Sequence, residues 1–147
     1  MDTLMAVKYA REQGARTLSI CNTQGATIPR ESDAVVYTHA GPEVAVASTK
    51  AFVAQITAIY LLGLQLGQVR GALAEERARE LVAELQAVPE KLAAVLSSGE
   101  RIREMAKWMA DTQSVLFLGR HVGFPVALEG ALKLKELAYI HAEGFAA

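Results

Sequence analysis

Three charged residues near the end of the chain have a spacing that could support acid–base chemistry. Glu129, Lys133 and Glu136 follow one another at i, i+4 and i+7, so on an α-helix they share one side, within about 40° of Glu129. In a cleft, desolvation and mutual proximity would separate their pKa values into acid and base roles. On a solvated surface they would form only a stabilising ladder of about 0.3 kcal/mol per pair. Spacing alone leaves both interpretations open.

A second candidate segment is the turn at residues 41–50, which leads into a long uncharged stretch. Ser48 is suited to be the N-cap of a helix that starts there. A helix N-terminus with hydroxyl groups can bind an anion or a sugar hydroxyl, although a plain cap explains the same residues. Lys50 in the first turn would oppose the helix dipole, which suggests that it has a partner.

The remaining reactive residue types predict no metal, nucleotide or organic cofactor. His39, His121 and His141 are far apart, with no i, i+4 pair and no neighbouring cysteine, so they do not predict a metal site. The turn from Gly119 to Gly123 lacks the Lys-Ser/Thr pair that holds a nucleotide phosphate. Cys21 falls in a predicted strand, where a small core residue is expected rather than a nucleophile.

Hydrophobic periodicity and turn residues predict the elements that position these groups. Helices are expected at residues 2–13, 48–68, 74–96 with a break at Pro89, 101–109 and 125–139, and strands at 17–21, 34–38 and 114–118. This order is typical of an α/β fold with parallel strands, in which ligands bind at the carboxyl ends of the strands. The candidate loops are therefore 22–25, 39–48 and 119–123.

The uncharged residues 51–69 are long enough to cross a bilayer. Their glutamines and Thr57 are polar, and the chain has no second such segment to provide partners in lipid. We expect a buried helix of a soluble protein, covered by a sheet on one face and by another helix or subunit on the other. Trp108 is likewise expected to be a packing residue.

Composition argues against nucleic-acid and membrane partners. The 147 residues carry 15 Lys+Arg against 16 Asp+Glu, which provides no footprint for a polyanion. With 52% hydrophobic residues the chain can bury a core. A single cysteine fits a reducing compartment, and no secretory pattern opens the sequence, so a cytoplasmic location is expected.

Two long stretches resemble a known family, the isomerase half of glutamine–fructose-6-phosphate aminotransferases. They are RESDAVVYTHAGPEVAVASTKAF at residues 30–52 and LGRHVGFPVALEGALKLKELAYIHAEGFAA at residues 118–147. The resemblance implies flavodoxin-like sugar isomerase (SIS) subdomains, each a doubly wound parallel sheet, here incomplete. Residues 1–70 would form the later part of the first subdomain, 71–112 connecting helices, and 113–147 the opening of the second.

The resemblance also implies an activity, namely formation of glucosamine 6-phosphate from fructose 6-phosphate and glutamine-derived ammonia by a homodimer. Glu136 matches the base that moves a proton between C1 and C2 of the sugar, and Glu129 and Lys133 match the groups that assist it. Val46 and Ser48 match residues that contact the sugar through main-chain and hydroxyl groups. No metal or cofactor is expected from the family.

Several family segments lie outside this sequence, so we expect the 147 residues to be inactive alone. The sequence begins just after the position of the family's Ser-Gln-Ser-Gly-Glu-Thr phosphate loop. It stops before the Gly-Glu-Leu-Lys-His-Gly-Pro segment, and it contains no glutaminase cysteine at its start. Two alternatives remain, a phosphosugar isomerase without amino transfer and a non-catalytic SIS module that senses sugar phosphates or dimerises.

Overall fold

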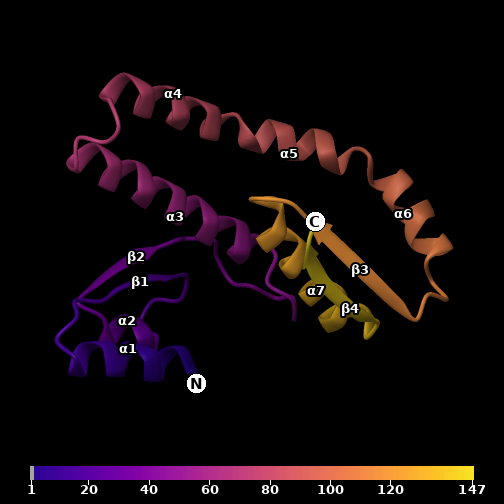
Figure 1. Cartoon of the computed structure of the whole chain (residues 1–147), viewed down its shortest axis with the longest axis horizontal. Helices are drawn as coiled ribbons and strands as arrows, with labels where there is room; N and C mark the ends of the chain where they lie inside the picture. Colours follow the sequence, from indigo (N-terminus) through magenta and orange to yellow (C-terminus); the bar gives the residue numbers. More distant parts are fainter. Residues whose placement is uncertain (1) are drawn as a thin grey trace. The chain divides into compact units, whose positions relative to one another are not determined.

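The structure, a computed structural model, describes residues 2–147, which divide into two compact units (Figure 1). The first unit ends at Val82 and the second runs Ala83–Ala147. Each unit contains a two-stranded parallel sheet with helices packed on it. The predicted α/β class with parallel strands is therefore confirmed.

The first unit is built on the parallel strands β1 (Leu18–Cys21) and β2 (Ala34–Tyr37). The register places Leu18 opposite Ala34 and Cys21 opposite Tyr37, so both strands end at the same edge. Helices α1 (Asp2–Glu12) and α2 (Thr27–Glu31) lie on one side of the strands and α3 (Lys50–Val69) on the other (Figure 1). Helices on both faces are what a doubly wound sheet requires.

The first helix and both strands agree with the sequence predictions. Gly14 ends α1 as expected, because it adopts a left-handed conformation with φ +79° and its N–H donates to the carbonyl of Arg11 at 2.9 Å. The connection between the strands, expected as a polar loop, instead contains the short helix α2 with Pro29 buried. A helix of five residues is too short to show a hydrophobic period.

The expectation of a well-covered α3 is wrong. One face of the helix lies over β2, and a cavity of about 420 Å³ is lined by residues of both elements. No residue of the helix is buried. Ile59 and Val69 are 58% and 72% exposed. Among the described helices, α3 is also the one that is long and apolar enough to cross a membrane, and its apolar window is 0% buried. Within the described residues of the first unit, no second layer covers the outer face of α3.

In the second unit, the end of one helix and two further helices precede the sheet. The division between the units falls within α4 (Glu75–Gln86), which is followed by α5 (Val88–Leu96) and α6 (Gly99–Trp108). The predicted break at Pro89 is confirmed, because the proline lies in the first turn of α5, where its missing N–H is harmless. The expectation for Trp108 is wrong, since 85% of this residue is exposed at the end of α6.

The sheet of the second unit pairs β3 (Ser114–Gly119) with β4 (His141–Ala146) in parallel, with α7 (Gly123–Ala138) between them in sequence and packed on both. Strand β3 and helix α7 were predicted, whereas β4 was not. Its sequence HAEGFA is poor in β-branched residues, so propensity does not indicate a strand. Backbone pairing with β3 decides its conformation.

Small residues allow α7 to approach its sheet closely. A Cβ atom at Gly130 would lie 2.9 Å from the ring of Phe117 on β3, which explains a glycine in the middle of this helix. Ala127 and Ala131 of α7 and Ala142 of β4 are buried. The packing of this unit is therefore set by short side chains at the contact between helix and sheet.

Candidate functional site

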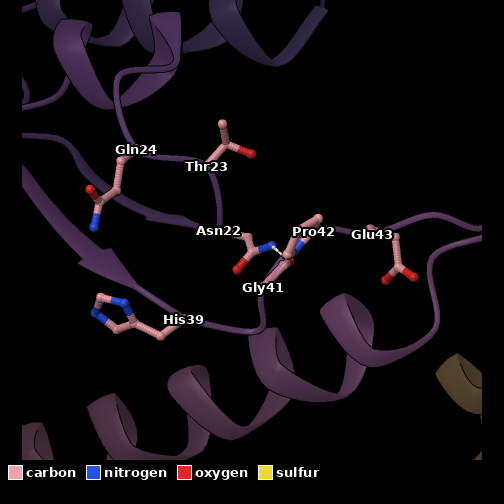
Figure 2. A pocket seen from close by; sticks show the side chains of 7 residues that line it. All are labelled: Asn22, Thr23, Gln24, His39, Gly41, Pro42 and Glu43. Carbon is pink, nitrogen blue, oxygen red and sulfur yellow. Dashed lines mark hydrogen bonds between the residues drawn. The ribbon is translucent and has the colours of Figure 1, made fainter.

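A cavity of about 570 Å³ opens at the carboxyl ends of β1 and β2 (Figure 2). Its lining comes from two of the three loops expected to bind a ligand, those that follow the two strands. The lining residues are Asn22, Thr23, Gln24, His39, Gly41, Pro42 and Glu43. In an α/β sheet, this edge is where loops with polar side chains converge.

Asn22 holds the loop that leaves β2. Its Nδ2 donates to the carbonyl of Gly41 at 2.7 Å, and its Oδ1 accepts from the Thr38 hydroxyl at 3.0 Å and the Ala40 N–H at 2.8 Å. Sequence reasoning placed Asn22 in a candidate loop but assigned it no role. An asparagine directly after a strand is a signal for such bonds, because its amide can both donate to and accept from neighbouring backbone.

Glu43 holds the next stretch of the same connection. Its carboxylate accepts from the N–H of Thr49 at 3.3 Å, the hydroxyl of Thr49 at 3.1 Å and the N–H of Ala51 at 3.1 Å. The bond from the Ala51 N–H, with those from Thr49 and the charge of Lys50, holds the pKa of Glu43 below its usual range. Glu43 is therefore a carboxylate on which the charge of Lys50 acts.

These contacts correct the prediction that Ser48 caps α3. Thr49 occupies the N-cap position, and its side chain makes no cap hydrogen bond. The carboxylate of Glu43 satisfies the N-terminal N–H groups instead. Sequence reasoning missed this because Glu43 precedes Thr49 by six residues, outside the spacing of a capping box.

The two predicted sugar-contacting residues, Val46 and Ser48, lie in the loop of residues 44–48 that Glu43 closes. Val46 is 88% exposed and Ser48 is half-buried, whereas Ala47 between them is fully buried. A buried alanine between two accessible residues anchors the middle of the loop. The structure therefore places Val46 and Ser48 together on one short, internally held loop.

The charged stripe of Glu129, Lys133 and Glu136 forms on α7 as its spacing predicts. Lys133 Nζ lies 2.5 Å from Glu129 Oε1 and 3.8 Å from Glu136 Oε2. The bond to Glu129 raises the pKa of Lys133 above its usual range, and both carboxylate charges add to the effect. The exposed fractions of the three side chains are 24%, 23% and 37% in chain order. The stripe is thus a continuous ion-pair ladder in which Glu129 and Lys133 are half-buried and Glu136 is exposed.

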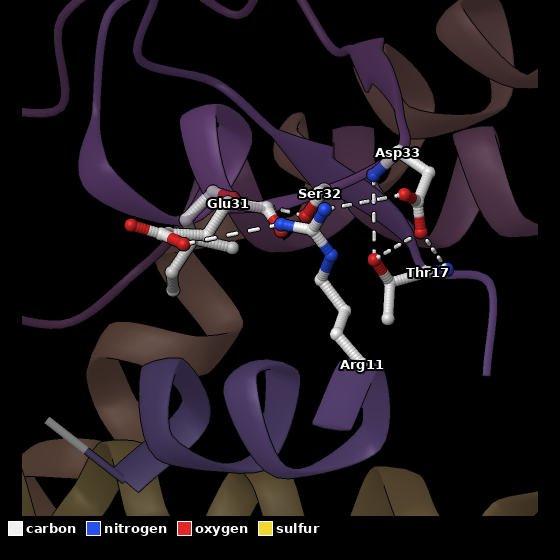
Figure 3. Close-up of polar contacts among 6 residues, drawn as sticks. Arg11, Thr17, Glu31, Ser32 and Asp33 are labelled. Carbon is white, nitrogen blue, oxygen red and sulfur yellow. Dashed lines mark hydrogen bonds and ion pairs between the residues drawn. The ribbon is translucent and has the colours of Figure 1, made fainter. Parts of the chain in front are cut away.

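A third polar cluster lies at the opposite, amino ends of β1 and β2 (Figure 3). The carboxylate of Asp33 accepts from the N–H of Thr17 at 2.7 Å and from its hydroxyl at 3.0 Å. Arg11 from the end of α1 donates to the carbonyl of Glu31 at 2.7 Å and lies 3.6 Å from the Asp33 carboxylate. The bonds from Thr17, with a smaller effect of Arg11, hold the pKa of Asp33 below its usual range. This cluster ties α1 to the start of β2.

Comparison with known proteins agrees with this geometry. The SIS domain model matches residues 1–65. Over all 147 residues the chain is 75% identical to the glutamine–fructose-6-phosphate aminotransferase [isomerizing] of Leifsonia xyli subsp. xyli, and over 148 aligned residues it is 66% identical to that of Corynebacterium diphtheriae. The chain corresponds to part of the SIS region of this aminotransferase family. It spans 24% of the length of these two relatives.

A solved structure supports the same assignment to the aminotransferase family. The C-terminal domain of the glucosamine–fructose-6-phosphate aminotransferase from Francisella tularensis matches 99% of this chain with a TM-score of 0.95 and 34% sequence identity, and the match covers 41% of that domain's chain. The SIS-type fold predicted from the resemblance is therefore confirmed. The catalytic and sugar-binding roles of the five site residues stay predictions. These residues are Val46, Ser48, Glu129, Lys133 and Glu136.

The histidines contribute little to these sites. His39 lines the cavity and has its ring centroid 6.2 Å from that of Tyr37. His39 and His121 both adopt left-handed backbone conformations, with φ of 51° and 55°, which is uncommon for residues other than glycine. Across residues 2–147, no group of three His, Cys, Asp or Glu side chains is arranged to hold a metal ion.

Proposed function

We propose that this chain is part of the sugar-isomerising region of an aminotransferase that converts fructose 6-phosphate and glutamine-derived ammonia to glucosamine 6-phosphate. The observation that carries the proposal is the 75% identity, over the whole of this chain, to an enzyme named for this reaction. Since the chain spans only 24% of that enzyme, the activity belongs to a protein that contains further parts of the family sequence.

Within this reaction, the charged stripe transfers the proton between C1 and C2 of the sugar. Glu136 acts as the base, and Glu129 and Lys133 assist it. Two features support these roles: the partial burial of Glu129 and Lys133, which strengthens the electrostatic interaction between them, and the position of Lys133 between the two carboxylates. The longer of its two contacts is to Glu136, which is also the most exposed of the three.

Val46 and Ser48 contact the sugar in this proposal, Val46 through its main chain and Ser48 through its hydroxyl. Support comes from their common loop, in which both remain accessible while Ala47 is buried. A sugar phosphate is therefore the proposed ligand. We also propose a homodimer, since the outer face of α3 carries exposed apolar side chains, and a cytoplasmic location, in keeping with one unpaired cysteine.

The three-part division at residues 70 and 112 also stays a proposal. It assigns the helices α4, α5 and α6 to the connection between two SIS subdomains. Support comes from the matched SIS domain, which ends at residue 65, before this connection starts.

A chimaera tests the function. We would replace the matching 147 residues of the Leifsonia xyli enzyme with this chain and measure glucosamine 6-phosphate formation. The unaltered chimaera is expected to be active, and Glu136→Gln is expected to lower kcat by about 100-fold or more, as loss of a general base does. Lys135→Gln, on the same helix outside the stripe, is the matched control and is expected to leave kcat unchanged.

Two outcomes would contradict the proposal. A Glu136→Gln chimaera with at least half of the unaltered kcat would remove Glu136 from proton transfer. An unaltered chimaera that binds fructose 6-phosphate without forming product would favour the alternative of a non-catalytic SIS module.

A further inference from the structure

We propose that Glu43 is a positioning residue, which sets the shape of the loop at residues 44–48 and thereby places Val46 and Ser48 against the sugar. This inference rests on the proposed function, because it takes Val46 and Ser48 as sugar contacts. Glu43 itself is not assigned to the substrate. It acts through the loop that it closes.

The contacts of Glu43 span both ends of this loop. Glu43 comes directly before the loop in sequence. Its carboxylate accepts hydrogen bonds from Thr49 and Ala51, which follow the loop. Together with the fully buried Ala47, these bonds fix the loop at its start, middle and end. A loop held at three points has few backbone conformations left to lose when a ligand binds, which favours tight binding.

The negative charge of the Glu43 carboxylate strengthens the hydrogen bonds that close the loop. Oε2 accepts from the N–H groups of Thr49 and Ala51, and Oε1 accepts from the Thr49 hydroxyl. Hydrogen bonds to an ionised carboxylate are about twice as strong as neutral ones, and a negative charge is favoured at the N-terminus of α3. An amide at this position could keep the geometry of some bonds but would lose both charge effects.

Residues 38–41, which precede Glu43, are held by hydrogen bonds that do not involve Glu43. Asn22, which follows β1, bonds to Thr38, Ala40 and Gly41, and Figure 2 shows it beside Gly41, with Glu43 further along the path from β2 to α3. Loss of Glu43 therefore leaves the first half of the connection in place. The change is expected to be confined to the loop of residues 44–48.

The experiment compares Glu43→Ala, Glu43→Gln and a control in the chimaera described above. We expect Glu43→Ala to raise KM for fructose 6-phosphate on the order of tenfold with kcat within about twofold, the pattern of lost ground-state and transition-state binding together. Glu43→Gln should raise KM by about threefold, as a partial rescue. Glu12→Gln, an exposed glutamate at the end of α1, is the matched control.

Amide NMR of the 147-residue chain provides a readout that is independent of activity. In the unaltered chain, the Thr49 and Ala51 amide shifts should follow one acidic titration with a midpoint below that of an ordinary glutamate, and both Glu43 variants should abolish it. The Val46, Ala47 and Ser48 amide signals should move in Glu43→Ala. Thermal unfolding of both Glu43 variants checks that they are folded.

Each result bears on one proposal. A Glu43→Ala chimaera whose KM stays within twofold of the unaltered one overturns the positioning role, as does a fall in kcat at unchanged KM. If the unaltered chimaera is inactive, the proposed function fails. The NMR experiment still tests the effect of Glu43 on the loop in that case. Amide signals at residues 46–48 that do not move in Glu43→Ala or Glu43→Gln would overturn this effect.

Discussion

Lys133 makes two unequal contacts, a short one with Glu129 and a longer one with Glu136. In such an arrangement, the cation between the two carboxylates offsets their mutual repulsion. It also means that the stabilising ladder and the acid–base site suggested by the sequence are the same set of contacts. An ion-pair ladder that stabilises α7 can therefore also hold the side chain of the proposed base in place.

The first prediction concerns this cation. In the chimaera, Lys133→Met should lower kcat on the order of tenfold, because the cation that lies between the two stripe carboxylates is lost. Lys135→Met is the control for removal of a charge from the same helix. A kcat within twofold of that of the unaltered chimaera would show that Lys133 does not assist the base.

The second prediction concerns Asp33, whose pKa is lowered mainly by bonds from Thr17. A carboxyl with a depressed folded-state pKa stabilises the fold above its unfolded pKa and loses this contribution as pH falls through the lower folded value. The melting temperature should therefore fall on acidification below about pH 4, and less steeply in Asp33→Asn. Melting curves by circular dichroism, with Asp111→Asn as control, test this; equal slopes would contradict it.

The space between a helix and its neighbours decides whether a mid-helix glycine can be replaced by a larger residue. Gly130 in α7 and Gly63 in α3 are both mid-helix glycines, but their surroundings differ. A Cβ at Gly130 would lie 2.9 Å from the Phe117 ring, whereas nothing lies within 4 Å of a Cβ at Gly63. The same substitution should therefore have opposite effects in the two helices.

The third prediction follows from this difference. Gly63→Ala should stabilise its unit by about 0.5–1 kcal/mol through helix propensity alone. Gly130→Ala should destabilise by about 1–2 kcal/mol, since forcing a methyl group against the Phe117 ring outweighs the propensity gain. Urea unfolding measures both, and adding Phe117→Leu to Gly130→Ala should restore part of the loss. Stabilisation by Gly130→Ala would show that the ring moves away at little cost.

For the whole molecule, the dominant feature is uncovered apolar surface. The accessible surface is 11166 Å², whereas two separate compact domains of these sizes would expose about 8,800 Å². The buried residues among those described are all small or short, namely alanines, Ser19, Pro29 and Gly119, and larger apolar side chains on α3 and α7 remain partly exposed. Surface of this kind is typical of a chain whose faces pack against further protein.

The fourth prediction is that the isolated 147-residue chain self-associates through such surface. Sedimentation velocity should show species larger than 15.8 kDa, and a hydrophobic dye should bind with enhanced fluorescence. Ile59→Lys, at an exposed position of α3, should shift the distribution toward the monomer, whereas Glu90→Lys on α5 should not. A monomeric chain without dye binding would contradict this prediction.

The sequence by itself determined those features that depend on near neighbours along the chain. The glycine that ends α1, the proline that opens α5 and the 3.6-residue spacing of the stripe on α7 act within one or two helical turns, so they are readable without the fold. The order of strands and helices was sufficient to predict parallel pairing, and the long family stretches were sufficient to predict the SIS region.

Only the tertiary structure decided the features that depend on residues distant in sequence or linked through a loop. Strand β4 exists because β3 supplies its hydrogen bonds, and Glu43 caps α3 because the loop at 44–48 folds back on it. The exposure of α3 and Trp108 depends on what packs beside them, which periodicity cannot specify. Hydrophobic pattern states that a side chain favours burial, but tertiary packing decides whether anything covers it.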